Sequence, residues 1–115
     1  MIMGLNEKMT SRANWLRKPT DLSPEAQKYW HLHAPGLHDA GILTVNTAEE
    51  FKILCRLLAT ARIAADEIEQ HGVTIATALG GRKSNPAVAA LIAAQRAALP
   101  LLTRFSLDLR VGLGL

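Results

Sequence analysis

The most regular hydrophobic pattern of the chain lies in NTAEEFKILCRLLATARIAADEIEQHG, residues 46–72. Its apolar residues recur at steps of three and four, which is the spacing of a coiled-coil seam. The seam consists of Phe51, Leu54, Leu58, Ala61, Ala65 and Ile68. Thr47 and Glu50 have the spacing of a capping box at the start, and Gly72 suits the end. The stretch predicts one long helix of about 25 residues, or about 37 Å.

The apolar face of this helix is wider than a two-stranded seam. Ile53, Leu57 and Ala64 lie beside the seam residues when the sequence is wound as a helix. A helix with such a wide face packs on two neighbours, and we expect one in the same chain and one in another subunit. The sequence therefore predicts a homo-oligomer with the six seam residues at its interface.

A second long helix is predicted after a short extended segment. VTIATAL, residues 73–79, is rich in β-branched residues. Asn85 or Ser84 then caps a helix with Pro86 at its first position. Pro100 lacks an N–H, so we expect a kink or a restart of the helix near residue 96. The expected packing side consists of Val88, Leu91, Ile92, Gln95, Leu99 and Leu102.

A shorter helix precedes the two long ones. Ser23 and Pro24 suit its N-cap and first position, so we expect it over roughly residues 24 to 34. Its packing side should hold Ala26, Trp30, His33 and Leu37. His31 and His33 point to different faces, so no metal site is expected. The predicted class is all-α: a long antiparallel helical hairpin plus a short N-terminal helix, with a small extended segment at the hairpin tip, assembling as an oligomer.

The two ends of the chain differ from the middle. Residues 1–21 are predicted to form a basic arm with some helical character, although a poorly ordered tail fits equally well. Residues 22–110 form the predicted helical oligomerisation domain. Residues 111–115 form an apolar tail that continues an alternation beginning at Leu107. This pattern suits either a strand that pairs outside the chain or a frayed end.

Composition and charge limit the classes of protein to which the chain can belong. The chain has 115 residues, 49% hydrophobic and 20% charged, which indicates one globular domain. Residues 1–20 carry four basic and one acidic residue, residues 21–72 four and eight, and residues 73–115 five and one. The single Cys55 is expected to be a buried hydrophobe in a reducing compartment. We find no signal peptide and no run long enough to span a membrane, which predicts a soluble intracellular protein.

The segment ALGGRKSNP, residues 78–86, invites comparison with a nucleotide-binding loop. Aligning Lys83 and Ser84 with the end of that motif leaves Arg82 and Thr77 where its glycines belong, so ATP binding is not expected. Two roles remain open for the basic pair. One is an ion pair with the carboxylates at the end of the long helix, and the other is contact with nucleic-acid phosphates.

Four segments carry a resemblance to a known family. They are LSPEAQKYWHLHAPGLHDAGILT, FKILCRLLATARIAADEIEQHGVTI, GGRKSNPAVAALIAAQRAALPLL and FSLDLR, within roughly residues 22–110. The features that carry it are Ala26 to Trp30, a link from Leu37 to Thr44, a β-like segment after Gly72, and Asn85-Pro86 opening the last helix. The chain resembles the small subunit of tailed-phage terminases with a tryptophan in the first helix. It lacks the usual acidic residue of the link and the proline of the tail.

The resemblance implies a ring that engages double-stranded viral DNA and presents it to the terminase large subunit, whose ATPase and nuclease it modulates. It implies no catalysis, no cofactor, no metal and no small-molecule substrate, in the cytoplasm of the bacterial host. The residues themselves agree, because no catalytic triad, paired carboxylates or metal cluster is recognisable.

Basic residues are the candidate DNA contacts. They are Lys8, Arg12, Arg17 and Lys18 of the arm, and Arg82 and Lys83 of the turn. Each arm neutralises few phosphates, but the copies in a ring act together. A helical adaptor that binds a foreign helix and no DNA is the alternative. A transcription regulator is disfavoured, because the last helix begins PAVAAL and lacks polar base readers.

Overall fold

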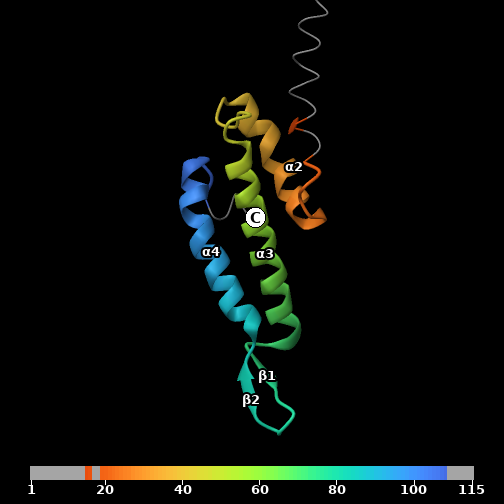
Figure 1. Cartoon of the computed structure of the whole chain (residues 1–115). Coiled ribbons are helices and arrows are strands. Elements are labelled where there is room, and N and C mark those ends of the chain that lie inside the picture. The colour runs from red at the N-terminus through yellow and green to blue at the C-terminus, as the bar shows by residue number, and fades with distance from the viewer. Residues whose placement is uncertain (1–14, 17–18, 109–115) are drawn as a thin grey trace, which may run out of the picture.

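The computed structural model describes residues 15–16 and 19–108. Their elements are α2 (Pro24–Asp39), α3 (Ala48–His71), β1 (Thr74–Ala76), β2 (Arg82–Ser84) and α4 (Pro86–Arg104). The long helices α3 and α4 run antiparallel, α2 lies along the first half of α3, and the strands extend from the far end of the pair (Figure 1). The predicted all-α class with an extended segment at the hairpin tip is confirmed.

The first helix, α2, begins as predicted but is longer. The Ser23 hydroxyl accepts a hydrogen bond from the Ala26 N–H at 3.3 Å, and Pro24 holds the first helical position. The helix then runs through Pro35, although it was expected to end near residue 34. Proline removes one backbone hydrogen bond, and the burial of Leu37 beyond it offsets that loss. The buried side holds Ala26, Tyr29, Trp30, Ala34 and Leu37, whereas His33 is only half-buried.

The long helix α3 has the predicted length, but its start is not a capping box. The Thr47 hydroxyl accepts a hydrogen bond from the Thr44 N–H at 2.9 Å and makes no bond to the first turn of the helix. The Glu50 carboxylate instead pairs with Arg104 at the end of α4. Gly72 ends the helix with φ +85°, a conformation in which glycine has no steric cost. The capping-box prediction was wrong, and the predicted end is confirmed.

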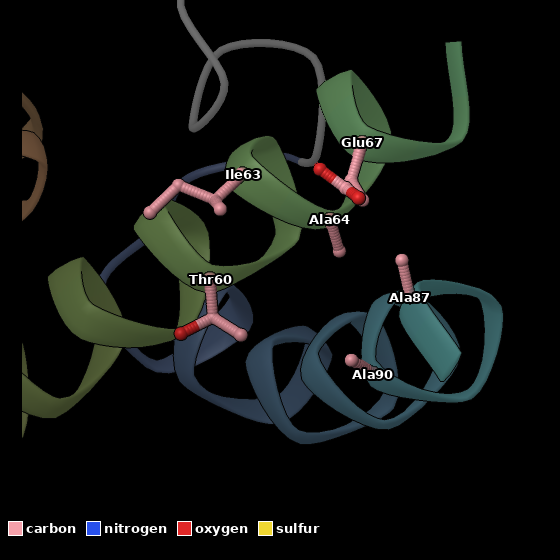
Figure 2. A pocket seen from close by; sticks show the side chains of 6 residues that line it. All are labelled: Thr60, Ile63, Ala64, Glu67, Ala87 and Ala90. Atoms are coloured by element: carbon pink, nitrogen blue, oxygen red, sulfur yellow. The ribbon is translucent and has the colours of Figure 1, made fainter. Parts of the chain in front are cut away.

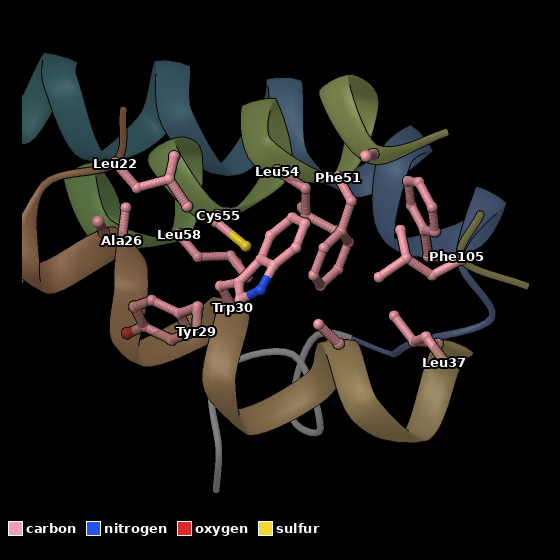
Figure 3. Packing of buried hydrophobic residues seen from close by; sticks show 14 of the residues in the cluster. Leu22, Ala26, Tyr29, Trp30, Leu37, Phe51, Leu54, Cys55, Leu58 and Phe105 are labelled. Atoms are coloured by element: carbon pink, nitrogen blue, oxygen red, sulfur yellow. The ribbon is translucent and has the colours of Figure 1, made fainter. Parts of the chain in front are cut away.

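An aromatic cluster forms the core where the three described helices meet (Figure 3). The rings of Trp30 and Phe51 have centroids 5.4 Å apart, and Phe51 lies 5.1 Å from Phe105, which directly follows α4. Trp15 packs edge-on against Trp30 with a centroid distance of 6.4 Å. The Trp30 indole N–H donates a hydrogen bond to the Leu16 carbonyl, which satisfies the one polar atom of this buried ring. Four segments of the chain thus meet at one set of rings.

The heptad seam of α3 points into this core. Four seam residues are buried by the chain itself, and the other two are half-buried. The buried ones are Phe51, Leu54, Leu58 and Ala61, and the half-buried ones are Ala65 and Ile68. The expected subunit interface needs correction for the first four, because α2 and α4 of the same chain already cover them. Cys55 is buried as well, and burial raises the pKa of its thiol to about 12.

The last helix, α4, packs on α3 through a side that matches the predicted one only in part, because Leu102 is buried as expected but two larger residues are not. Its buried residues are Ala94, Ala98 and Leu102, and the small alanines let the two helices approach closely. Ile92 and Leu99, which were expected to pack, are 45% and 50% exposed. The predicted restart near residue 96 does not occur, because α4 is one helix through Pro100. The carbonyl that Pro100 leaves without an intrahelical partner belongs to Arg96, and both residues are exposed.

The expectation that no segment is long enough to span a membrane was also wrong for α4. Its 19 residues reach a mean hydropathy of 1.4, which by length and composition alone is enough to cross a bilayer. Apolar helices of soluble proteins share these properties. In this chain α4 lies along α3, whose exposed side is rich in charged residues.

Asn85, the one polar side chain buried in the part of the chain that the structure describes, closes the helical hairpin. Its Oδ1 accepts from the Ala87 N–H at 3.0 Å and so caps α4, as predicted. Its Nδ2 donates to the Gly72 carbonyl at 2.9 Å, and its backbone N–H donates to Val73 at 2.9 Å. One residue therefore joins the end of α3 to the start of α4.

Replacing Asn85 tests this joint. We expect Asn85→Ala to lower the free energy of unfolding by about 1–3 kcal/mol, because the cap and a buried hydrogen bond are both lost. Asn85→Asp keeps the capping oxygen but removes the donor to Gly72, so a loss of about 1–2 kcal/mol is expected. Urea denaturation followed by circular dichroism measures both. Equal stability of Asn85→Ala and the exposed control Ser84→Ala would contradict this role.

Replacing a seam residue tests whether the seam stabilises the single chain. We expect Phe51→Ala to lower the free energy of unfolding by about 3–5 kcal/mol, because a buried ring leaves a cavity. Its neighbour Ile53 is 47% exposed, so Ile53→Ala should have a much smaller effect. Thermal unfolding at several protein concentrations is the measurement. If Phe51→Ala merely dissociated subunits and left the helices equally stable, the seam would belong to an interface after all.

Candidate functional site

The β-hairpin is a short prong beyond the ends of α3 and α4 (Figure 1). Its strands pair antiparallel, with Thr74 opposite Ser84 and Ala76 opposite Arg82. The Thr77 N–H donates to the Gly81 carbonyl at 2.8 Å, and the Gly81 N–H returns a bond to the Thr77 hydroxyl at 3.0 Å. These two hydrogen bonds join the residues on either side of the turn and so fix the conformation of the tip.

The basic pair of this hairpin makes no ion pair with the carboxylates at the end of α3. The Arg82 guanidinium donates from Nε to the Thr74 hydroxyl and from Nη2 to the Thr74 carbonyl, both at 2.8 Å. At the end of α3, Arg62 pairs with Asp66 and His71 with Glu67, each at 3.5 Å. Among the described residues neither Arg82 nor Lys83 pairs with a carboxylate. Of the two roles left open for the basic pair, the ion pair with the end of α3 is therefore wrong.

The four basic residues expected in the arm, Lys8, Arg12, Arg17 and Lys18, lie outside the described residues. The neighbouring Trp15 and Leu16 contact Trp30 of α2, beside the first half of α3. Arg82 and Lys83 lie beyond the opposite end of α3. Trp15 and Leu16, which lie between the basic residues of the arm, are therefore far from the hairpin, at the other end of α3.

Several basic residues of α3 are neutralised within the chain. Lys52 Nζ lies 3.1 Å from carboxylate oxygens of both Asp21 and Glu49, and Arg56 lies 3.1 Å from Asp21. The hydrogen bond from Lys52 lowers the pKa of Asp21. Partial burial works to lower the pKa of Lys52, but its hydrogen bonds with the two carboxylates outweigh burial and raise it. These cations join the turn that precedes α2 to α3 and are poor candidates for binding phosphate.

An apolar hollow lies between α3 and α4, where α2 does not reach. Its volume is about 390 Å³, and small side chains dominate its wall (Figure 2). Thr60, Ile63, Ala64 and Glu67 of α3 and Ala87 and Ala90 of α4 line it. The hydrophobic pattern of the sequence does not indicate this surface, because alanine and threonine positions carry little weight in such a pattern.

A largely apolar ridge runs along one flank of α4. Val88, Ile92, Gln95 and Leu99 recur at steps of four and three, which places them on one side of the helix. Ile92 and Leu99 are exposed, and the other two are half-buried. The sequence had identified these residues as a packing surface, but α3 leaves Ile92 and Leu99 uncovered.

Groups suited to catalysis do not converge in the described part of the chain. No group of three or more histidine, cysteine, aspartate or glutamate residues is placed there to hold a metal ion. The arrangement offers instead a helical body with an uncovered apolar face and a basic prong.

Comparison with known proteins adds the family. No curated protein and no solved structure matches the chain significantly. A profile of the family described as "Phage terminase, small subunit" matches residues 26–110, from the first turn of α2 past the end of α4. The match spans well over half of the 115 residues and contains the hollow, the ridge and the hairpin. The chain therefore belongs to the phage terminase small subunit family.

Proposed function

We propose that this chain is the DNA-recognising, regulatory component of a viral genome-packaging motor. It binds double-stranded viral DNA and presents it to the large ATPase and nuclease subunit, in the cytoplasm of the bacterial host. It catalyses no reaction itself and needs no cofactor, metal or small-molecule substrate. The observation that carries this proposal is the family match over residues 26–110.

The proposed working form is a homo-oligomer, and the uncovered face of α3 and α4 supports it. The ridge of one subunit (Val88, Ile92, Gln95 and Leu99) would fill the hollow of the next, where small side chains leave room. Helices pack in this way when large residues of one insert between small residues of the other. Ridge and hollow are different surfaces, so the contact is head-to-tail and closes into a ring when the rotation permits.

Charge on the two helices fits the same arrangement. The end of α3 carries the acidic residues Asp66, Glu67 and Glu69, whereas the chain has no acidic residue from 70 to 107. Arg96 projects from the exposed side of α4. A head-to-tail contact would bring the acidic edge of one subunit to the basic edge of the next, which favours the correct register.

The basic arm, residues 1–21, is the proposed contact with DNA phosphates, together with Arg82 and Lys83. Copies of a weak basic element add their contributions in a ring, because binding of the first raises the effective concentration of the rest. Residues 22–110 remain the proposed oligomerisation domain, and the tail, 111–115, lies outside the described residues. In the alternative function, a helical adaptor, the hollow and the ridge would bind a helix of another protein instead of a second copy of this chain.

Two interface variants test the head-to-tail contact. We expect Ile92→Asp, which puts a charge on the ridge, and Ala90→Glu, which fills the hollow, each to reduce the assembly to monomers. Leu32 on α2 is 57% exposed and lies on neither surface, so Leu32→Asp is the matched control. Light scattering coupled to size exclusion gives the mass. Mixing the two interface variants leaves one intact junction and should yield dimers.

A wild-type monomer at all concentrations would overturn the oligomer and favour the adaptor. Full assembly of both interface variants would instead show that subunits meet through another surface.

The arm is tested by its effect on salt-dependent DNA binding. We expect the combined change of Lys8, Arg12, Arg17 and Lys18 to Ala to weaken duplex binding and to reduce the slope of log K against log salt by about 0.9 per lost phosphate contact. Fluorescence anisotropy at several salt concentrations measures the slope. Lys28→Ala, an exposed lysine paired with Glu25, is the control. An unchanged slope in the combined variant would mean that the arm does not contact phosphate.

A further inference from the structure

The tip of the β-hairpin presents a large aliphatic side chain to solvent. Leu79 is 99% exposed, at the end of a prong that extends past both long helices (Figure 1). Gly80 and Gly81 follow Leu79 and carry no side chains. A Cβ at Gly80 would meet nothing within 4 Å, so no other group packs beside Leu79 at that position. A single exposed leucine needs no explanation in general. This one is the apex of a projecting, hydrogen-bonded turn.

Positive charge flanks this apex on both faces of the ribbon. Side chains alternate along a strand, so Arg82, opposite Ala76, and Lys83, opposite Ile75, point to opposite faces. The two bonds from Arg82 to Thr74 orient the guanidinium and leave Nη1 without a partner among the described residues. With no carboxylate from residue 70 to 107, no acidic group of the hairpin itself offsets the charge. Arg82 and Lys83 could therefore contact two separate rows of negative charge, one on each side of the ribbon.

The prong is held firmly at its base. Asn85 bonds to the Gly72 carbonyl and to the first turn of α4, so the strands leave the helices in a fixed direction. The turn is closed by the Thr77–Gly81 bonds. A side chain that is to be forced between stacked groups needs such a support, because a flexible loop would bend away.

We propose that the β-hairpin inserts into the minor groove of duplex DNA, with Leu79 as a wedge between two base pairs and Arg82 and Lys83 on the phosphates of the two strands. The proposal rests on the DNA-binding function proposed above. Proteins that bend DNA from the minor groove combine apolar wedges with flanking cations in this way. The two strands of the hairpin are only three residues each, too short to present a row of readers along the major groove.

This contact would give the protein a preference for certain DNA sites without reading bases. The tip residues Ala78, Leu79, Gly80 and Gly81 offer no polar side chain to a base edge. Pyrimidine–purine steps unstack and kink more easily than others, so a wedge favours sites that contain them. The start of α4 offers no polar base readers either, because it begins with small apolar residues. Selection of DNA sites by their deformability would therefore fit this chain.

The test measures bending and affinity separately on the full-length protein. Duplexes labelled at both ends, with or without a central TA step, report bending by energy transfer, and anisotropy reports affinity. The wild type should bend the TA duplex by roughly 20–90°. Leu79→Ala should leave the duplex straight and abolish the preference for TA, whereas Leu79→Phe should keep both. Leu32→Ala, at an exposed leucine of α2, should behave as wild type.

The cations have their own expected result. Lys83→Ala should weaken binding to both duplexes alike and reduce the salt slope by about 0.9 per lost contact, because phosphate contacts carry no sequence information. An unbent duplex with wild-type protein, or equal bending by Leu79→Ala, overturns the wedge. If Leu79→Ala bends DNA normally but no longer stimulates the large subunit, the tip is a protein contact and the wedge is likewise wrong. Absence of any DNA binding would overturn the proposed function itself.

Discussion

The contact among Trp30, Phe51 and Phe105 is the interaction on which the described structure depends. These rings come from α2, from the start of α3 and from the residue after α4, with centroids 5.4 and 5.1 Å apart. Elements distant in sequence therefore meet at one end of the helical hairpin. Aromatic side chains bury more apolar area than any others, and the chain has only five of them. Concentrating them at one end stabilises that end and leaves the other to smaller contacts.

The helical hairpin consequently has two unlike halves. The first half of α3 is covered by α2, and its lysine and arginine are paired with Asp21 and Glu49. The second half faces α4 through alanines, with no third helix among the described residues and an apolar hollow on one side. Free cationic groups and open apolar surface occur together in this second half. The stable half supports the structure, and the open half is the one suited to partners.

The fold could be predicted from local signals because those signals act on the backbone nearby. Ser23 and Asn85 accept from N–H groups in the first turns they cap, and Gly72 takes a positive φ that other residues avoid. The partner of each apolar side was harder to predict. In α4 almost every position is apolar, so the pattern does not distinguish the buried alanines Ala94 and Ala98 from the exposed Ile92 and Leu99. Residue size suggested the larger pair, but close approach of two helices requires the smaller.

The same preference for small residues explains why the candidate site was predicted only in part. Arg82 and Lys83 stood out as charges, and the structure places them on opposite faces of a ribbon. The hollow is made by Ala64, Ala87 and Ala90, where the sequence shows only short side chains. A larger residue at Ala87 or Ala90 would fill the space, and one at the buried Ala64 would also separate α3 from α4. The alanines thus satisfy two constraints: the buried Ala64 lets the two helices pack closely within the chain, and all three leave a concave apolar surface between them. Burying that surface against a neighbour would stabilise the half that lacks an aromatic core, so assembly and a rigid hairpin base would reinforce each other.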